Sequence, residues 1–273
     1  KSRVLHFLAE DPEKRVPTAA KAVALAQKIN NLGLGLIPEP WRRRFESPLL
    51  RGPGPVPGAA SLAEAVRPDQ AFILAPAEIE DARDVPETAF YFPGCGAGLF
   101  SRDIGLAVIF LLLRQGVSVV LPDRHLCCGY PLLAQGMEEA YANNYGNNVA
   151  KLRMILDKAG RKGFKPGLVL TSCGTCRESL HRHGIEATFG PKARHMDALQ
   201  FLAGKFAPGG FAATADLLYH AACHAEWTGQ NPAKAPEAYR KALAALTGSR
   251  VTLSPGCCGE SGLGALTSPR IYN

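Results

Sequence analysis

The 8 cysteines of this chain fall into two sets, and each set contains an adjacent pair that is followed by glycine. The first set is Cys95, Cys127, Cys128, Cys173 and Cys176, and the second is Cys223, Cys257 and Cys258. No cysteine lies within the body of a predicted helix, where a thiol used as a small apolar core residue would be expected. The cysteines are therefore assigned to a site, and the fold must bring distant loops together there.

Short apolar runs that precede the first cysteines predict strands at 89–95, 117–122 and 167–173. Helical patterns lie between them, at 102–116 and over roughly 136–159, and a further helix begins at CGTCRESLHRHG. Strands that alternate with helices through short links indicate a parallel sheet with right-handed crossovers. Open α/β sheets bind their ligands at the carboxyl ends of the strands, so the cysteines should meet at that edge.

The same order of elements starts again later in the chain. A strand is predicted at 215–223, a helix at 235–248 and another strand at 251–255, just before the second cysteine pair. The expected fold is α/β, with two tandem copies of a small parallel-sheet module, the second truncated, and the cysteine-bearing loops of both copies at a shared cleft. The predicted regions are a Pro- and Gly-rich, partly helical connector (1–86, with a helix at 18–29), a first cysteine-rich module (87–205) and a second (206–273).

Composition excludes several classes of function. The net charge of +7 does not indicate nucleic-acid binding, because the basic residues are scattered and no aromatic-studded basic stripe is present. The longest apolar run, at 106–113, is far shorter than the roughly 20 residues of a membrane helix. The first residues carry no secretory signal pattern, and the chain starts at Lys1, as a piece of a longer protein would. We expect a cytoplasmic protein without a transmembrane segment.

Three kinds of thiol chemistry stay open from the residues alone. Soft thiolate ligands suit an iron–sulfur cluster or zinc, and the CxxC at 173–176 also suits thiol–disulfide exchange. The adjacent pairs favour a cluster, because neighbouring residues cannot easily aim both sulfurs at one tetrahedral ion. Glycines such as Gly94, Gly129 and Gly174 let the backbone approach a bulky group, and the helix start near Cys173 favours thiolate.

Three histidines stand close to cysteines in the sequence, namely His125, His220 and His224. Each could ligate a metal, donate a hydrogen bond to sulfur or have a plain structural role. Three others are assigned to helices or helix ends, with surface or packing roles: His181, His183 and His195. No Ser-His-Asp arrangement and no paired carboxylates indicate hydrolysis.

The stretches FYFPGCG, LCCGYP, SCGTC, YHAACH and CCGESG resemble the cysteine-rich CCG domain family, over about 88–273. Its members include the B subunit of heterodisulfide reductase, the iron–sulfur subunits of glycolate oxidase and of anaerobic glycerol-3-phosphate dehydrogenase, and lactate-utilisation proteins. The chain looks most like the carboxyl-terminal part of bacterial fusions in which an FAD-linked oxidase and a ferredoxin-like segment precede this module.

The resemblance implies an oxidoreductase component that passes electrons from a flavin to an acceptor through a [4Fe–4S]-type cluster, which is non-cubane in heterodisulfide reductases. The flavin enzyme would oxidise a 2-hydroxy acid such as glycolate or D-lactate. One cluster would be ligated by Cys95, Cys127, Cys128, Cys173 and Cys176, and part of a second by Cys223, Cys257 and Cys258. The implied partners are a domain or subunit that carries FAD, a ferredoxin-like segment and an acceptor such as a quinone. Through a partner the protein could reach the inner face of a membrane.

The sequence departs from the family pattern in three places. The second copy has no CxxC within the sequence, the gap between Cys128 and Cys173 is long, and Ala221 and Ala222 stand where Asp-Pro is usual. A second cluster is therefore not expected to be complete in this sequence. Two rival functions remain, which are disulfide reduction at the cluster and a zinc-binding interaction module.

Overall fold

One sheet of five strands organises most of the molecule. The computed structural model describes residues 2–33, 61–66, 73–76, 87–211 and 213–256. The strands there are β1 (Ile73–Leu74), β2 (Glu87–Phe92), β3 (Val117–Val120), β4 (Leu168–Thr171), β5 (Arg194–Asp197), β6 (Leu217–Tyr219) and β7 (Val251–Leu253). The helices are α1 (Ser2–Glu10), α2 (Pro12–Gly33), α4 (Leu62–Val66), α5 (Arg102–Arg114), α6 (Tyr130–Leu133), α7 (Glu138–Arg161), α8 (Gly174–Arg182), α9 (Glu186–Phe189), α10 (Ala198–Ala203) and α11 (Ala235–Thr247), with short helical turns η4 (Gly96–Phe100) and η5 (Pro232–Lys234). The α/β class predicted from the sequence is confirmed.

The strand order of the main sheet is β1-β3-β2-β4-β5, and all neighbours are parallel except β1, which pairs antiparallel with β3. The chain passes from β2 through α5 to β3 on one side, and then through α7 to β4 on the other side of β2. Strands β2 and β4 are therefore neighbours, but the connection that follows β2 runs to one side of the sheet and the connection that follows β4 runs to the other. In open α/β sheets this arrangement creates a crevice at the carboxyl ends of the two strands.

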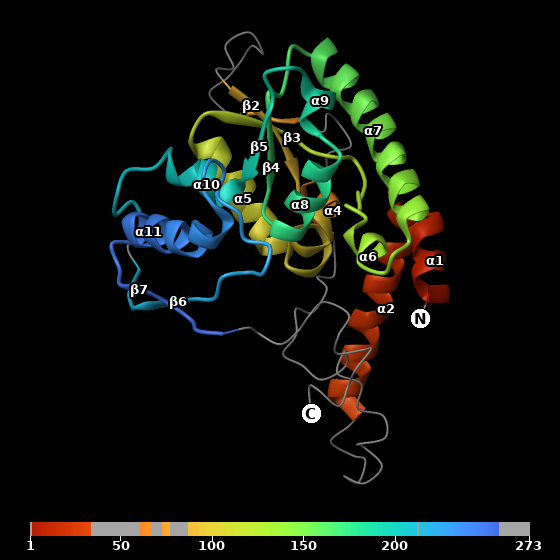
Figure 1. Cartoon of the computed structure of the whole chain (residues 1–273), viewed down its shortest axis with the longest axis horizontal. Coiled ribbons are helices and arrows are strands. Elements are labelled where there is room, and N and C mark those ends of the chain that lie inside the picture. Colours follow the sequence, from red (N-terminus) through yellow and green to blue (C-terminus); the bar gives the residue numbers. More distant parts are fainter. Residues whose placement is uncertain (1, 34–60, 67–72, 77–86, 212, 257–273) are drawn as a thin grey trace.

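Strand β2 is buried on both faces, and its alternating side chains supply two separate cores. Phe90 and Phe92 pack with side chains of α7 and α8, whereas Ala89 and Tyr91 pack with those of α5 and α10. This follows from the two-residue period of a strand, which sends neighbouring side chains to opposite faces. Burying each phenylalanine contributes about 1.5–3 kcal/mol. Figure 1 shows the helices on either side of the sheet.

The later part of the chain forms a smaller unit in which β6 and β7 pair in parallel and α11 connects them. This strand-helix-strand order is the one predicted for 215–255, with somewhat shorter strands. The unit lies beside α10, against which α11 packs (Figure 1). The division into two tandem modules remains a prediction.

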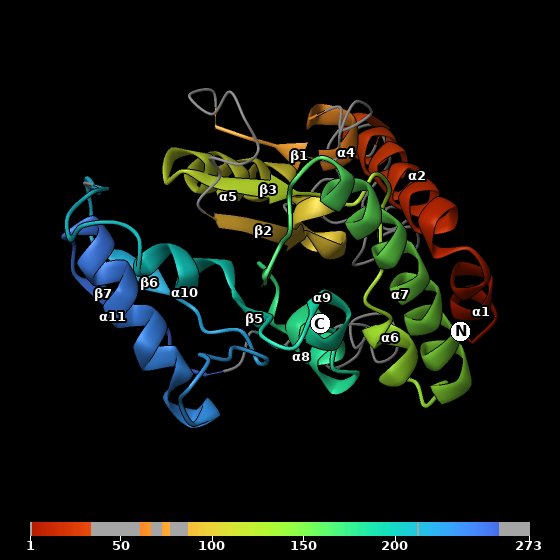
Figure 2. The same cartoon turned by 90° about the horizontal axis from the view of Figure 1, so that it is seen from above.

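The region predicted as a connector, with one or two helices and little core of its own, contributes more to the fold than expected. Helix α1 lies beside α7 (Figure 2), and Glu13 at the start of α2 pairs with Lys151 of α7. Leu62 of α4 is buried in the core on the α5 side, and β1 extends the main sheet. No helix in the described part of the chain is long and apolar enough to span a bilayer.

Two strands of the main sheet were absent from the sequence prediction. The edge strand β1 has only two residues, too few for an alternating pattern. Strand β5 reads Arg-His-Met-Asp, which lacks the apolar run of a typical buried strand, yet His195 and Asp197 are buried within it. Strand β2, in turn, ends earlier than predicted, because Pro93 and Gly94, with a φ of 58°, turn the chain away.

Candidate metal centre

Five cysteines lie where three parallel strands end. Cys95 follows β2, the adjacent pair 127–128 follows β3, and Cys173 and Cys176 follow β4 at the first turn of α8. Strands β2 and β4 are neighbours in the sheet, and β3 flanks β2 on its other side. The structure therefore brings together, at the predicted edge of the sheet, all members of the first cysteine set.

The thiols of these cysteines form one connected group. Cys95 and Cys127 hydrogen-bond to each other, and Cys176 hydrogen-bonds to both Cys128 and Cys173. Cys95 also interacts electrostatically with Cys128 and Cys173, so the two halves of the group lie close together. The adjacent pair thus sends its two sulfurs to different partners. Such a spread of donors suits a group with several metal atoms better than a single tetrahedral ion.

Two of the thiols are held as thiolates. A hydrogen bond from Cys95, assisted by His125, keeps the pKa of Cys127 well below its usual range despite burial. A hydrogen bond from Cys176, together with backbone N–H groups at the start of α8, lowers the pKa of Cys173 to about 6. Thiolates are the form in which cysteine ligates metals, so the site is electronically prepared for a soft cation.

Two glycines beside the thiols occupy positions that no other residue would fill without strain. Gly94 has a φ of 58°, and a Cβ there would lie 2.6 Å from Sγ of Cys176. Gly129, which follows the cysteine pair, has a φ of 79°, and its Cβ would lie 2.7 Å from Nδ2 of Asn144. The backbone therefore approaches the thiol group closely, as the glycine pattern predicted.

The loop of the adjacent pair is fixed by side chains from two helices. Asn144 and Asn148 of α7 donate their amide N–H groups to the carbonyl oxygen of Cys127, at 2.9 and 2.8 Å. Ser179 of α8 donates its hydroxyl to the carbonyl oxygen of Cys128, at 2.7 Å. These contacts fix the peptide groups of Cys127 and Cys128 and so the positions of their sulfurs. We refer to the pair Asn144 and Asn148 as the asparagine clamp.

These hydrogen bonds were not predicted from the sequence, although a signal for them was present. The two asparagines are four residues apart and so share one face of α7. That face is otherwise apolar, and its buried residues are Tyr141, Asn144, Asn148, Leu152, Ile155 and Ala159. An amide in a buried stripe must find a hydrogen-bond partner, which marks such a residue as a candidate for positioning.

The second cysteine set is only partly described. Cys223 is exposed and follows β6, whereas Cys257 and Cys258 lie outside the described residues. Their predicted role as ligands of a second cluster stays a prediction, as does the ligand role of the first set.

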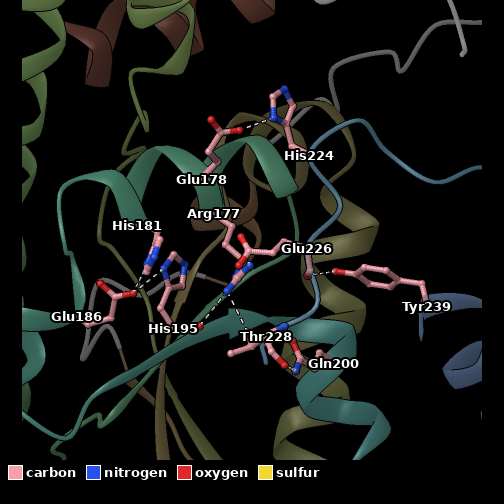
Figure 3. Close-up of polar contacts among 10 residues, drawn as sticks. All are labelled: Arg177, Glu178, His181, Glu186, His195, Gln200, His224, Glu226, Thr228 and Tyr239. Carbon is pink, nitrogen blue, oxygen red and sulfur yellow. Dashed lines mark hydrogen bonds and ion pairs between the residues drawn. The ribbon is translucent and has the colours of Figure 1, made fainter. Parts of the chain in front are cut away.

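The loop around Cys223 packs against the beginning of α8. A Cβ on Gly174 would lie 2.1 Å from the carbonyl oxygen of His224, so only glycine permits this approach. The ring of His224 contacts Glu178 of α8 through Nδ1, and the buried Arg177 of α8 pairs with Glu226 (Figure 3). The smaller unit is thereby held against the helix that carries the CxxC motif.

The histidines that lie near cysteines in the sequence have different surroundings in the structure. Nε2 of His125 lies 3.5 Å from Sγ of Cys95, and the same ring contacts Cys127. His125 is therefore part of the thiol group's surroundings, whereas His220 is exposed. The assignment of His195 to a helix or helix end was wrong, because this residue lies in strand β5 with its side chain fully buried.

Comparisons with known proteins relate part of this chain to a cysteine-rich family and to iron-sulfur proteins. Residues 89–181 match the family model described as a cysteine-rich domain, CCG. The chain is 25% identical over 63% of its length to the B subunit of the fumarate reductase (CoM/CoB) of Methanothermobacter marburgensis, of which it covers 32%. It is 27% identical over 72% of its length to an uncharacterized iron-sulfur protein of Methanocaldococcus jannaschii, of which it covers 36%.

A second uncharacterized iron-sulfur protein, from Methanococcus maripaludis, is 24% identical over 63% of the chain and is covered to 32%. The chain thus spans about a third of the length of the curated relatives it matches. No solved structure gives a significant match.

Proposed function

We propose that this chain, whose residues 89–181 match the model of the CCG family of cysteine-rich domains, is the iron–sulfur electron-transfer part of a flavin-linked oxidoreductase. The relatives support a redox role, because they are iron-sulfur proteins and a reductase subunit. The specific enzyme type is a 2-hydroxy-acid dehydrogenase, of which the glycolate and D-lactate enzymes are examples. Its FAD would lie on another domain or subunit, and its acceptor would be a quinone or another carrier.

The observation that carries this proposal is the gathering of five thiols from three strand ends into one connected group at one edge of the sheet. The donor set fits an iron–sulfur cluster, since it contains more soft ligands than one zinc ion requires, and two of them are thiolates. The residues that would hold it are Cys95, Cys127, Cys128, Cys173 and Cys176. Such a cluster accepts and releases single electrons when bound.

The protein residues around this site have their own tasks. The asparagine clamp on Cys127 fixes the position of one sulfur, and His125 supplies a polar contact to the same sulfur and to Cys95. Hydrogen bonds from the first turn of α8 to Cys173 stabilise negative charge. Together they set the electrostatic environment that tunes a reduction potential.

A second candidate function is reduction of a disulfide at this site, and one feature of the structure favours it. A cavity of about 400 Å³ lies between the main sheet and the smaller unit, lined in part by Ser172 and Gly174, which flank Cys173. Its walls are largely apolar, with Asp197, Tyr219 and Tyr239 among the lining residues. A small organic substrate could enter next to a ligand thiol, whereas a purely electron-carrying domain has no need for such a cavity.

The first experiment determines iron, acid-labile sulfide and zinc per chain after purification without oxygen. We expect about four irons with matching sulfide for one [4Fe–4S] centre, and their loss in a Cys127→Ser/Cys128→Ser variant. The control is Cys223→Ser, which changes an exposed cysteine outside the connected thiol group and should leave this iron in place. Zinc in place of iron would instead favour the interaction module.

The second experiment separates the two redox functions. The cluster-loaded protein is mixed with a flavoprotein that oxidises glycolate or D-lactate, and bleaching of the visible absorbance is followed after the hydroxy acid is added. Bleaching supports the flavin-linked role. Oxidation of the reduced protein by a small heterodisulfide, with no response to the reduced flavoprotein, supports the alternative.

A further inference from the structure

A second group of metal-ligating side chains lies on the opposite end of α8 from the CxxC motif. His181 is in the last turn of α8, Glu186 is the first residue of α9, and His195 lies in strand β5. One ligand atom from each falls within 4.8 Å of the other two. Figure 3 shows both imidazole rings beside the Glu186 carboxylate.

The carboxylate of Glu186 lies beside both rings. Oε1 of Glu186 is 2.8 Å from Nδ1 of His181 and 3.6 Å from Nδ1 of His195. The group therefore offers one carboxylate oxygen and two imidazole nitrogens.

His195 gives an independent reason to expect a ligand. Its side chain is 0% exposed, and neither ring nitrogen lies within normal hydrogen-bond distance of a partner among the described residues, since Oε1 of Glu186 is 3.6 Å from Nδ1. Buried polar atoms in folded proteins nearly always have a hydrogen-bond partner. The imidazole of His195 faces the carboxylate of Glu186 but lies too far from it for a normal hydrogen bond. A metal ion would supply that partner.

We infer that His181, Glu186 and His195 form a second metal site. Its ligand is a divalent transition-metal ion, and Zn²⁺ fits the donors best. Two imidazoles and a carboxylate are typical zinc donors, whereas Ca²⁺ and Mg²⁺ prefer oxygen alone. His181 is 62% exposed, so its ring is free to rotate onto the ion and solvent can supply a fourth ligand.

The location of the site gives it a structural task. The ion joins the end of α8 to α9 and β5, and the same helix carries Cys176 in its first turn. His181 is five residues after Cys176, which is about 7.5 Å along a helix. Zinc would therefore anchor the helix that presents the thiols, without touching them.

The test compares zinc binding to wild-type protein, His181→Ala and Glu186→Gln, with His6→Ala as the control. His6 is an exposed histidine on α1, outside the site. Since the thiols also bind zinc, each protein is titrated past saturation of all sites, and bound zinc is counted and examined by X-ray absorption. We expect wild type and His6→Ala to bind about one zinc more than the other two variants. That ion should show nitrogen or oxygen neighbours at about 2.0–2.1 Å and no sulfur at about 2.3 Å.

Several results would overturn the inference. They are equal zinc counts in all four proteins, a zinc spectrum explained by sulfur neighbours alone, or a His181→Ala variant that binds zinc as tightly as wild type or more tightly. Circular dichroism spectra confirm that the variants fold, and both altered side chains are partly exposed. The result does not depend on whether the thiols bind iron, so it neither supports nor contradicts the proposed function.

Discussion

The asparagine clamp on the Cys127 loop leads to the sharpest prediction. Replacing both Asn144 and Asn148 by alanine removes two hydrogen bonds to the carbonyl oxygen of Cys127, of 2.9 and 2.8 Å. Each such bond contributes about 0.5–1.5 kcal/mol net. The two side chains are 4% and 3% exposed, so water would not readily replace them. With about 1 kcal/mol more for the poorly satisfied carbonyl, the double variant should lose about 2–4 kcal/mol of unfolding free energy.

The sequence offers a matched control, because it contains two adjacent asparagine pairs in YANNYGNNV. Asn143 and Asn147 each directly precede one of these residues on α7, and both are exposed. The Asn143→Ala/Asn147→Ala variant makes the same chemical change on the same helix, and its stability should stay within about 0.5 kcal/mol of wild type.

Urea unfolding of the metal-free, reduced protein, followed by circular dichroism, measures both variants, and iron per chain is determined after purification without oxygen. The Asn144→Ala/Asn148→Ala variant should also retain less iron than the control, because the loop that carries the adjacent pair is released. Equal stability of the two double variants would refute the clamp. Lower stability with full iron retention would show that the clamp serves the fold but not the site.

Gly94→Ala should destabilise the protein by about 1–3 kcal/mol more than Gly116→Ala. Both glycines have a positive φ, but only a Cβ at position 94 would meet Sγ of Cys176. Equal urea midpoints of the two variants would contradict this close approach. Burial raises the pKa of Asp197 to about 6, against about 3.9 in an unfolded chain. Unfolding free energy should therefore fall by about 3 kcal/mol as pH rises from about 3 to about 7, and an unchanged difference between wild type and Asp197→Asn across that range would argue against this burial. In metal-free protein, alkylation of Cys173 by iodoacetamide should slow as pH drops through about 6, and a midpoint near that of an ordinary thiol would show that α8 does not stabilise the thiolate.

The location of the first cysteine set at one edge of the sheet followed from sequence alone. Apolar runs identify β2, β3 and β4, and each cysteine follows the end of one of them. Parallel strands all end at the same edge, so no long-range information was needed to expect that the thiols gather there. Glycine at positions 94 and 129 indicated close backbone approach for a similarly local reason.

The partners of each residue were not accessible in the same way. Whether β4 lies beside β2 or beside β3 depends on the crossover through α7, and that choice decides which strand ends are neighbours. The pairing of Cys95 with Cys127 and of Cys128 with Cys176 depends on it in turn. The same holds for the buried amides of α7, whose acceptor lies on a different loop.

His195 shows most clearly what was decided only in three dimensions. Its strand has no apolar pattern, because it lies at the edge of the sheet and is buried by helices rather than by its own neighbours in sequence. Local spacing identified which residues carry the thiol chemistry and at which edge they meet. Tertiary packing decided which thiols contact one another, which amides hold them, and that two histidines and a glutamate converge at the far end of α8, because each of these depends on contacts between segments that the sequence keeps apart.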